Sequence, residues 1–263
     1  MQTRLPISVA IVTLNEEANL RRCLESVRDL ASEIVVLDSG STDGTQAVAE
    51  KFGAVFASSP WAGFAEQKNK CMEKCSQSWV LFLDADEELT PELAAAIRKA
   101  FANGEPAGDG FWVNRRTFYL GEWIWHSWYP EWILRLVRKN NARWVGLEPH
   151  AFLRESGRLE KLPGDLLHYS FRDLHDHLQR TIKYARIMAE SFHARGQRFR
   201  WSKLLVSPWL SFLKHLVLRG GWRDGWRGWL IAFSKWLDVF AKYAFLLEIE
   251  RNSSPSTTAS PPI

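Results

Sequence analysis

The segment Trp79-Val80-Leu81-Phe82-Leu83-Asp84-Ala85-Asp86-Glu87-Glu88 decides the expected fold. Its first five residues are continuously apolar and are bounded by polar residues, which is typical of a strand buried inside a sheet. Asp84 and Asp86 follow at once, at the C-terminal edge where open α/β sheets bind ligands. Carboxylate oxygens suit Mg²⁺ or Mn²⁺, which in proteins usually bridge carboxylates to phosphates. Because acidic pairs also occur in solvated turns, this pair needs support from other segments.

Two earlier strands end in short polar side chains as well. Residues 7–13 form one apolar run and residues 33–38 form another, which enters a turn rich in glycine and serine at 39–45. Strands that alternate with helical patterns predict a parallel, right-handed βαβ sheet. The polar residues expected at its shared edge are Thr13, Asn15, Asp38, Asp84 and Asp86. The serines and glycines of the turn could also act only as helix caps and tight bends.

Together these segments resemble glycosyltransferase family 2, the inverting enzymes of GT-A fold that use nucleotide-diphosphate sugars. The matching segments are VTLNEE at 12–17, VVLDSGSTDGT at 35–45, QKN at 67–69 and LDADE at 83–87. Three further segments, at 118–124, 128–136 and 167–170, resemble the bacterial lipopolysaccharide core subgroup, which includes enzymes that add β-glucose to the inner-core heptose. The resemblance covers roughly residues 5–250.

This resemblance implies an α/β fold, with a GT-A, Rossmann-like, mostly parallel sheet and flanking helices, followed by a C-terminal amphipathic helical region. It implies a UDP-sugar donor and a divalent metal, Mg²⁺ or Mn²⁺, held by Asp86, which would neutralise the charge that develops on the β-phosphate. By motif position Asp84 would face the ribose, Asp38 the uracil ring and Lys68 the diphosphate. The nucleotide-sugar pocket would thus comprise Thr13, Asn15, Glu16, Asp38, Lys68 and Asp84.

Inversion requires a base that takes the proton from the acceptor hydroxyl. Relatives usually carry His followed by Glu or Asp in this region, whereas here His150 precedes Ala151. Glu148 is the first candidate base, and Glu131 and His150 are the others, since imidazole titrates near neutrality. Each of the three could instead bind the acceptor, and the carboxylates could lie on an ordinary surface.

Aromatic residues gather at 118–129, and Trp128 is among them. Such rings fit an acceptor cleft because sugars present C–H faces to aromatic planes, although burial in the core would explain some of them. Arg135 begins a basic stretch that could recognise acceptor phosphates or carboxylates, or could form a solvated edge.

Charge and tryptophan are distributed unevenly along the chain. Residues 1–171 carry 19 Lys/Arg and 23 Asp/Glu, whereas residues 172–263 carry 15 and 7, together with six of the 14 tryptophans. We therefore expect a GT-A domain at 1–165, a basic, Trp-rich helical membrane-docking region at 166–251, and a disordered tail at 252–263.

The helical region suggests an anionic membrane surface as a partner, because tryptophan and cations are enriched together. No run of eighteen uncharged apolar residues occurs, so a spanning helix is not expected. The helices could alternatively pack on the catalytic domain or mediate self-association. Nucleic acid is disfavoured, since no recognised binding signature accompanies the charge.

The three cysteines, Cys23, Cys71 and Cys75, form no disulfide framework. Cys71 and Cys75 could share a metal on one helix face, but buried free thiols in a reducing compartment are the simpler interpretation. No signal peptide precedes the first strand. A cytoplasmic, peripheral location on the inner face of the cytoplasmic membrane is expected.

The expected activity is metal-dependent, inverting transfer of a hexose from a UDP-sugar to a membrane-borne saccharide such as the lipopolysaccharide inner core. Glucose is the first candidate for the hexose. Three alternatives remain: transfer to polyprenyl phosphate, which is already ionised and needs no base; nucleotidyl transfer; and a non-catalytic membrane adaptor. A nucleotidyltransferase would carry a glycine-rich phosphate loop after its first strand, and this sequence lacks one.

Overall fold

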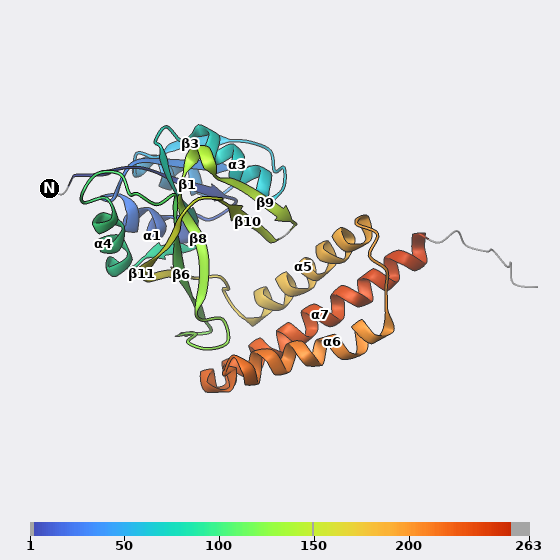
Figure 1. Cartoon of the computed structure of the whole chain (residues 1–263). Coiled ribbons are helices and arrows are strands. Elements are labelled where there is room, and N and C mark those ends of the chain that lie inside the picture. Colours follow the sequence, from blue (N-terminus) through green and yellow to red (C-terminus); the bar gives the residue numbers. More distant parts are fainter. Residues whose placement is uncertain (1–2, 149, 254–263) are drawn as a thin grey trace, which may run out of the picture. The chain divides into compact units, whose positions relative to one another are not determined.

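The structure, a computed structural model, describes residues 3–148 and 150–253. It divides into two compact units. The first runs to Gly146 and resumes over His150–Ser170, and the second consists of the chain from Phe171 onward with the short segment around Glu148. Figure 1 shows the elements of both units.

The first unit is built from strands and helices that alternate in its N-terminal half. In chain order they are β1 (Leu5–Thr13), α1 (Glu17–Val27), β2 (Ala31–Asp38), α2 (Thr45–Lys51), β3 (Val55–Ser58), α3 (Phe64–Lys74), β4 (Trp79–Asp84), β5 (Glu87–Leu89), α4 (Pro91–Ala100), β6 (Gly110–Tyr119), β7 (Glu122–Trp123), β8 (Glu131–Arg138), the 3₁₀ turn η1 (Lys139–Asn141), β9 (Arg143–Leu147), β10 (His150–Arg154) and β11 (Leu159–His168).

A nine-stranded mixed sheet organises this unit, in the order β3-β2-β1-β4-β8-β6-β11-β5, with β7 paired to β6. The neighbours among β3, β2, β1 and β4 are parallel. Beyond β4 the sheet becomes mixed, because β8 runs antiparallel to both β4 and β6, while β11 is parallel to β6. The α/β class is confirmed, and the parallel arrangement holds for the four N-terminal strands.

The strand register places the polar residues at one edge. Thr13 of β1 lies opposite Asp38 of β2, and Val12 lies opposite Asp84 of β4. Because β1, β2 and β4 are parallel and in this register, their C-terminal residues lie side by side at one edge of the sheet.

Both faces of the sheet are covered by apolar side chains. Leu24 of α1 and Ile97 of α4 pack with Ile11 on one face, and Cys71 of α3 packs with Phe82 on the other. The central strands are buried on both sides, which explains why β1 and β4 are continuous apolar runs with no alternation. All three cysteines are buried free thiols, as expected.

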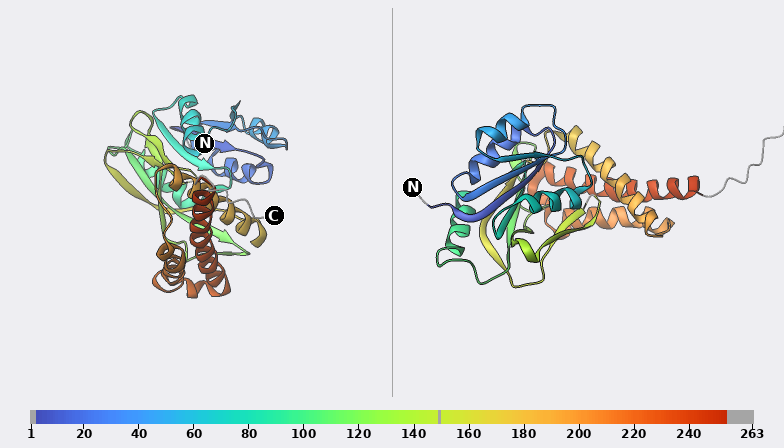
Figure 2. Two further views of the ribbon diagram at one scale, coloured as in Figure 1. Left: turned by 90° about the vertical axis from the view of Figure 1, so that its right-hand side faces the viewer. Right: turned by 90° about the horizontal axis from the view of Figure 1, so that it is seen from above.

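In the described residues the second unit contains three helices and two short turns. These are α5 (Leu174–Ala194), α6 (Trp201–Leu213), the π-helical turn η2 (Lys214–Leu218), the 3₁₀ turn η3 (Gly221–Asp224) and α7 (Gly225–Ser253). Figure 2 shows these helices in two further views, in the yellow to red part of the colour range. Helix α7 packs against both α5 and α6. Asp173 caps α5 by accepting a 2.8 Å hydrogen bond from the amide of Asp176.

The two expected boundaries of the helical region are corrected by the structure. Strand β11 extends to His168, because Leu166 is buried in the core of the first unit and pairs with Arg115 of β6. Helix α7 continues to Ser253, two residues into the expected tail. The rest of that tail, 254–263, lies outside the described residues. Across the described ranges, no helix combines the length and the apolar content that crossing a membrane requires.

Candidate active site

Two loops at the C-terminal ends of β1 and β2 are tied together by Asn15. Its amide donates to the Ser41 hydroxyl over 2.8 Å, and its side-chain oxygen accepts a 2.8 Å hydrogen bond from the amide of Thr42. Asn15 has φ +56°, a left-handed conformation that asparagine tolerates better than most residues. The next amide, that of Glu16, donates to the Thr45 hydroxyl over 2.9 Å. The loops are thus one folded element.

Asp38 organises the second of these loops. It is buried and accepts hydrogen bonds from the Thr13 hydroxyl (3.1 Å), the amides of Gly40 and Ser41 (2.8 Å each) and the Ser41 hydroxyl (2.5 Å). Burial opposes ionisation of Asp38, but these hydrogen bonds outweigh it and lower the pKa of the carboxyl. Both carboxylate oxygens of Asp38 therefore already accept hydrogen bonds. The contact with uracil that the family resemblance implies would require uracil to replace one of these donors.

Asp84 lies between two cations. Lys68 Nζ lies 2.6 Å from one carboxylate oxygen, and Arg135 Nη2 lies 2.8 Å from the other. Burial raises the pKa of Asp84, but Lys68 and Arg135 together hold it well below its usual range. The carboxylate is thus ionised and fixed in orientation. Lys68 also lies 4.4 Å from the centre of the Trp144 ring.

Behind Asp84 lies a buried network of charges that joins four strands. Glu87 is fully buried and accepts hydrogen bonds from Arg135 (2.7 Å), Arg115 (3.2 Å) and the amide of Asp84 (2.9 Å). Arg115 in turn makes a bidentate pair with Glu131, at 2.9 and 3.0 Å. Buried charges persist only when paired in this way. The network therefore holds the ends of β4, β5, β6 and β8 in one arrangement.

Arg135 differs in position from both alternatives of the sequence analysis, which were recognition of acceptor phosphates or carboxylates and a solvated basic edge. The residue is only 4% exposed, because β8 is an interior strand at this position. Its guanidinium forms ion pairs with Asp84 and Glu87, and these pairs fix the position of Asp84.

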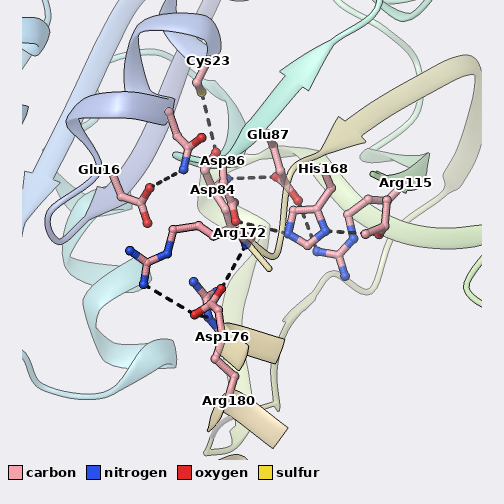
Figure 3. A network of polar contacts seen from close by, with 12 residues as sticks. Glu16, Cys23, Asp84, Asp86, Glu87, Arg115, His168, Arg172, Asp176 and Arg180 are labelled. Carbon is pink, nitrogen blue, oxygen red and sulfur yellow. Dashed lines mark hydrogen bonds and ion pairs between the residues drawn. The ribbon is translucent and has the colours of Figure 1, made fainter. Parts of the chain in front are cut away.

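Asp86 faces His168 from the end of β11 (Figure 3). The Asp86 Oδ2 and His168 Nε2 atoms are 3.5 Å apart, and the two side chains are 16% and 13% exposed. His168 Nδ1 lies 3.4 Å from the Thr117 hydroxyl, and the amide of Tyr169 donates to the Asp86 carbonyl over 2.9 Å. Burial opposes ionisation of Asp86, but His168 outweighs it and lowers the pKa of the carboxyl.

This pair fits a divalent cation by the chemistry of its donors. A carboxylate and an imidazole on neighbouring strand ends suit Mn²⁺ and related ions. Among residues 3–148 and 150–253 no cluster of three His, Cys, Asp or Glu side chains forms a ready-made site. An ion at Asp86 would thus take its other ligands from a bound phosphate and water. His168 belongs to a segment that the sequence analysis singled out without giving it a role, because nothing local indicates that β11 ends beside β5, where His168 pairs with Glu87.

The three candidate bases have different positions. Glu131 lies at the margin of the charge network, with its side chain 38% exposed; partial burial raises its pKa, but Arg115 outweighs this effect and lowers it. Glu148 lies in the turn between β9 and β10, and its carbonyl accepts a 3.4 Å hydrogen bond from the Ser191 hydroxyl. His150 begins β10, and its side chain lies outside what the structure describes.

The aromatic segment separates into packed and exposed rings. Trp128 is half-buried against Tyr119, with ring centres 5.3 Å apart. Trp125 is 50% exposed, and its ring centre lies 4.4 Å from the Arg116 guanidinium. The ring most available to a sugar is thus Trp125, which the sequence analysis did not distinguish from its neighbours.

The chain matches a known protein family and known proteins over most of its length. The family model described as glycosyl transferase family 2 matches residues 8–156. The lipopolysaccharide core biosynthesis glycosyltransferase LpsC of Rhizobium meliloti (strain 1021) is 33% identical over 258 residues, which are 94% of this chain and 92% of that protein. An uncharacterized glycosyltransferase of Rickettsia typhi is 28% identical over 246 residues, 88% of this chain and 84% of that protein.

Two solved structures are also similar. S. aureus TarS 1–349 in complex with UDP has a TM-score of 0.48 and 16% identity, over 96% of this chain and 93% of that chain. Glucosyl-3-phosphoglycerate synthase from Mycobacterium tuberculosis, in complex with Mn²⁺, UDP and phosphoglyceric acid, has a TM-score of 0.32 and 29% identity, over 44% of this chain and 43% of that chain.

Proposed function

The chain belongs to glycosyl transferase family 2, and from this premise we propose that it is an inverting, metal-dependent hexosyltransferase with a UDP-sugar donor, UDP-glucose first. We propose a membrane-borne saccharide, such as the lipopolysaccharide inner core, as its acceptor. The acceptor class is supported by LpsC, which matches nearly the whole chain and is named as a lipopolysaccharide core enzyme. The corresponding location is peripheral, on the inner face of the cytoplasmic membrane.

One observation carries the proposal: an acidic pair, Asp84 and Asp86, that lies among cations and beside an imidazole at one sheet edge. A nucleoside diphosphate is an anion that needs both positive charge and a divalent ion. Lys68 has three donor hydrogens, of which Asp84 takes one, so the others remain for a phosphate oxygen.

In the proposed mechanism Asp86 and His168 would hold the ion, which when bound would act as a Lewis acid on the leaving diphosphate. Asp84, fixed by Lys68 and Arg135, would accept hydrogen bonds from the ribose hydroxyls. Thr13, through its bond to Asp38, would maintain the loop that borders the base.

We propose Glu148 as the base that takes the acceptor proton. Glu131 is less suited to this step, because both its oxygens already accept from Arg115 and its lowered pKa weakens it as a base. Substitution Glu148→Gln is expected to lower kcat by about 100-fold or more with little change in UDP affinity, since general base catalysis contributes about 10²–10⁴. Glu155→Gln is the matched control, and equal activity of both variants would contradict the assignment.

A second acceptor, polyprenyl phosphate, is favoured by one observation. Ala151 stands where the family resemblance leads us to expect an acid, and Glu131 is already ion-paired, whereas an ionised phosphate needs no base. Product analysis with UDP-glucose separates the acceptors, since one yields a glucosylated core oligosaccharide and the other a lipid-linked sugar phosphate.

The first experiment is calorimetric titration of UDP into the full chain with Mn²⁺ or with EDTA. We expect binding that requires Mn²⁺, that Asp86→Ala abolishes and that Asp29→Ala, a control at an exposed aspartate, retains. UDP binding that is equal in EDTA, or unchanged in Asp86→Ala, would refute the metal assignment.

A further inference from the structure

The second unit has an exposed apolar surface on α6, η2 and the first turns of α7. Twelve of the 20 exposed large apolar residues in the described chain lie between positions 201 and 233. We call this surface the hairpin face and define it by Trp209, Leu210, Leu213, Leu218, Trp229 and Phe233. Leu210 is 61% exposed and Leu218 is 81% exposed. An apolar surface of this extent is unusual on a free protein and marks an interaction site.

The hairpin face is continuous across the two helices. The Phe212 ring of α6 lies 4.8 Å from that of Phe233 and 6.2 Å from that of Trp229, both on α7. The Trp209 ring lies 5.6 Å from that of Trp236. These ring contacts place the exposed aromatic residues of both helices along one seam, so the face spans both helices.

Cations border this face. Residues 195–235 contain nine Lys/Arg and a single acid, Asp224. Lys203 of α6 and Lys214, the helical residue that directly follows α6, are both exposed and, at about 100° per residue, lie within roughly 20° of each other on a wheel continued from α6. On the same wheel Leu210 lies within about 40° of both lysines and Leu213 lies about 60° further round, so two ammonium groups line one edge of the apolar stripe.

We propose that the hairpin face docks on a bilayer of anionic phospholipids. Exposed Leu and Trp side chains beside Lys and Arg are the arrangement that suits the interfacial plane of such a bilayer. A second copy of this chain is a poorer occupant, because a two-fold contact would bring the same strongly basic segment against itself. This inference rests on the proposed function, whose acceptor is membrane-borne, and it deepens that function by assigning docking to one half of the helical unit.

The remaining half of the unit is packed differently. Beyond Trp236, the apolar residues of α7 are half-buried or buried, and Arg186 of α5 pairs with Glu248 over 2.9 Å. Lys242 is half-buried among Phe192 and Tyr243. The C-terminal half of α7 therefore packs against α5 within the unit, and the proposed docking does not extend along the whole amphipathic helix.

The test is flotation of the full chain with vesicles of phosphatidylcholine containing 30% phosphatidylglycerol, and with pure phosphatidylcholine. We expect the wild type to float with the vesicles that contain phosphatidylglycerol and to remain at the bottom of the gradient with pure phosphatidylcholine. Leu210→Ser/Leu218→Ser should lower partitioning by about 100-fold or more, since two exposed apolar side chains leave the bilayer. The matched control is Val55→Ser/Trp61→Ser, which removes exposed apolar residues of the first unit and should have no effect.

Substitutions that remove lysine charges test the contribution of the cations that border the hairpin face. Lys203→Ala/Lys214→Ala should weaken partitioning by about 30-fold at low salt, at about 1 kcal/mol per cation, and by less at high salt. Lys74→Ala/Lys99→Ala, with the same change of charge on the first unit, should match the wild type.

Three outcomes would overturn the proposal: no flotation of the wild type, equal flotation of the hairpin-face and control variants, or a lipid-free dimer that Leu210→Ser/Leu218→Ser dissociates in light scattering. UDP titration of each variant separates this result from the proposed function. Lost flotation with intact Mn²⁺-dependent UDP binding supports docking, whereas lost UDP binding in the wild type contradicts only the transferase site.

Discussion

Replacing Glu87 by Gln removes one charge from the centre of the buried network while keeping the shape of the side chain. Breaking a buried ion pair typically costs about 3–5 kcal/mol, because a charge is left without its partner. In the Glu87→Gln variant Arg135 still pairs with Asp84, and Arg115 still pairs with Glu131. We therefore expect a loss of unfolding free energy at the lower end of this range, about 3 kcal/mol. At about 2–4 °C per kcal/mol for a domain of this size, the midpoint of unfolding should fall by about 6–12 °C.

Thermal unfolding followed by circular dichroism measures this loss. The control is Glu105→Gln, which makes the same chemical change in an exposed pair with Arg138 and should cost less than about 1 kcal/mol. If Glu87→Gln unfolds within 1 °C of this control, the network does not hold the strand ends together and the reasoning is wrong.

Three further predictions concern other parts of the chain. Asn15→Ala should cost about 1–2 kcal/mol, because alanine disfavours φ +56° and loses the bond to Thr42, and Asn15→Gly should cost less; urea titration compares them. Burial lowers the pKa of His177 to about 4, from an ordinary value of 6.5. The unfolded chain therefore binds more protons between those values, so stability should fall by about 3 kcal/mol as pH drops from 6.5 to 4, and His177→Gln should remove this dependence. Gly228→Ala places a Cβ 1.7 Å from the Gly221 carbonyl oxygen and should lower the unfolding midpoint of the second unit; an unchanged midpoint in calorimetry would contradict the close approach.

The parallel half of the fold could be predicted because its signals are local. Each of β1, β2 and β4 is a short apolar run followed by polar residues, and helical spacing separates the first two. Once these strands are parallel, Thr13, Asp38 and Asp84 must meet, and the register confirms that they do.

The second half of the site could not be predicted, because it depends on contacts between distant segments. Nothing in the sequence near Arg135 indicates that β8 inserts antiparallel between β4 and β6. Without that insertion Arg135 resembles a surface cation, whereas with it the guanidinium meets Glu87 of β5. His168 is a similar case, because β11 reaches Asp86 only by lying beyond β6.

For the second unit, spacing predicted helices but not which side of each helix is covered. The apolar residues from Trp226 onward recur at regular intervals, yet Trp226, Trp229 and Phe233 are exposed, whereas Leu246 is buried and its neighbours Phe245 and Leu247 are half-buried. The difference arises from α5, which packs against part of α7 and whose position no local pattern specifies.

The burial of Cys23, Cys71 and Cys75 has a practical consequence for spectroscopy. Burial raises the pKa of all three thiols, that of Cys75 to about 12, and the thiolate is the form that reacts with maleimides. A cysteine introduced by Leu218→Cys would therefore be the single accessible thiol of the chain. An environment-sensitive fluorophore attached there could report contact with lipid in real time without removal of any native cysteine.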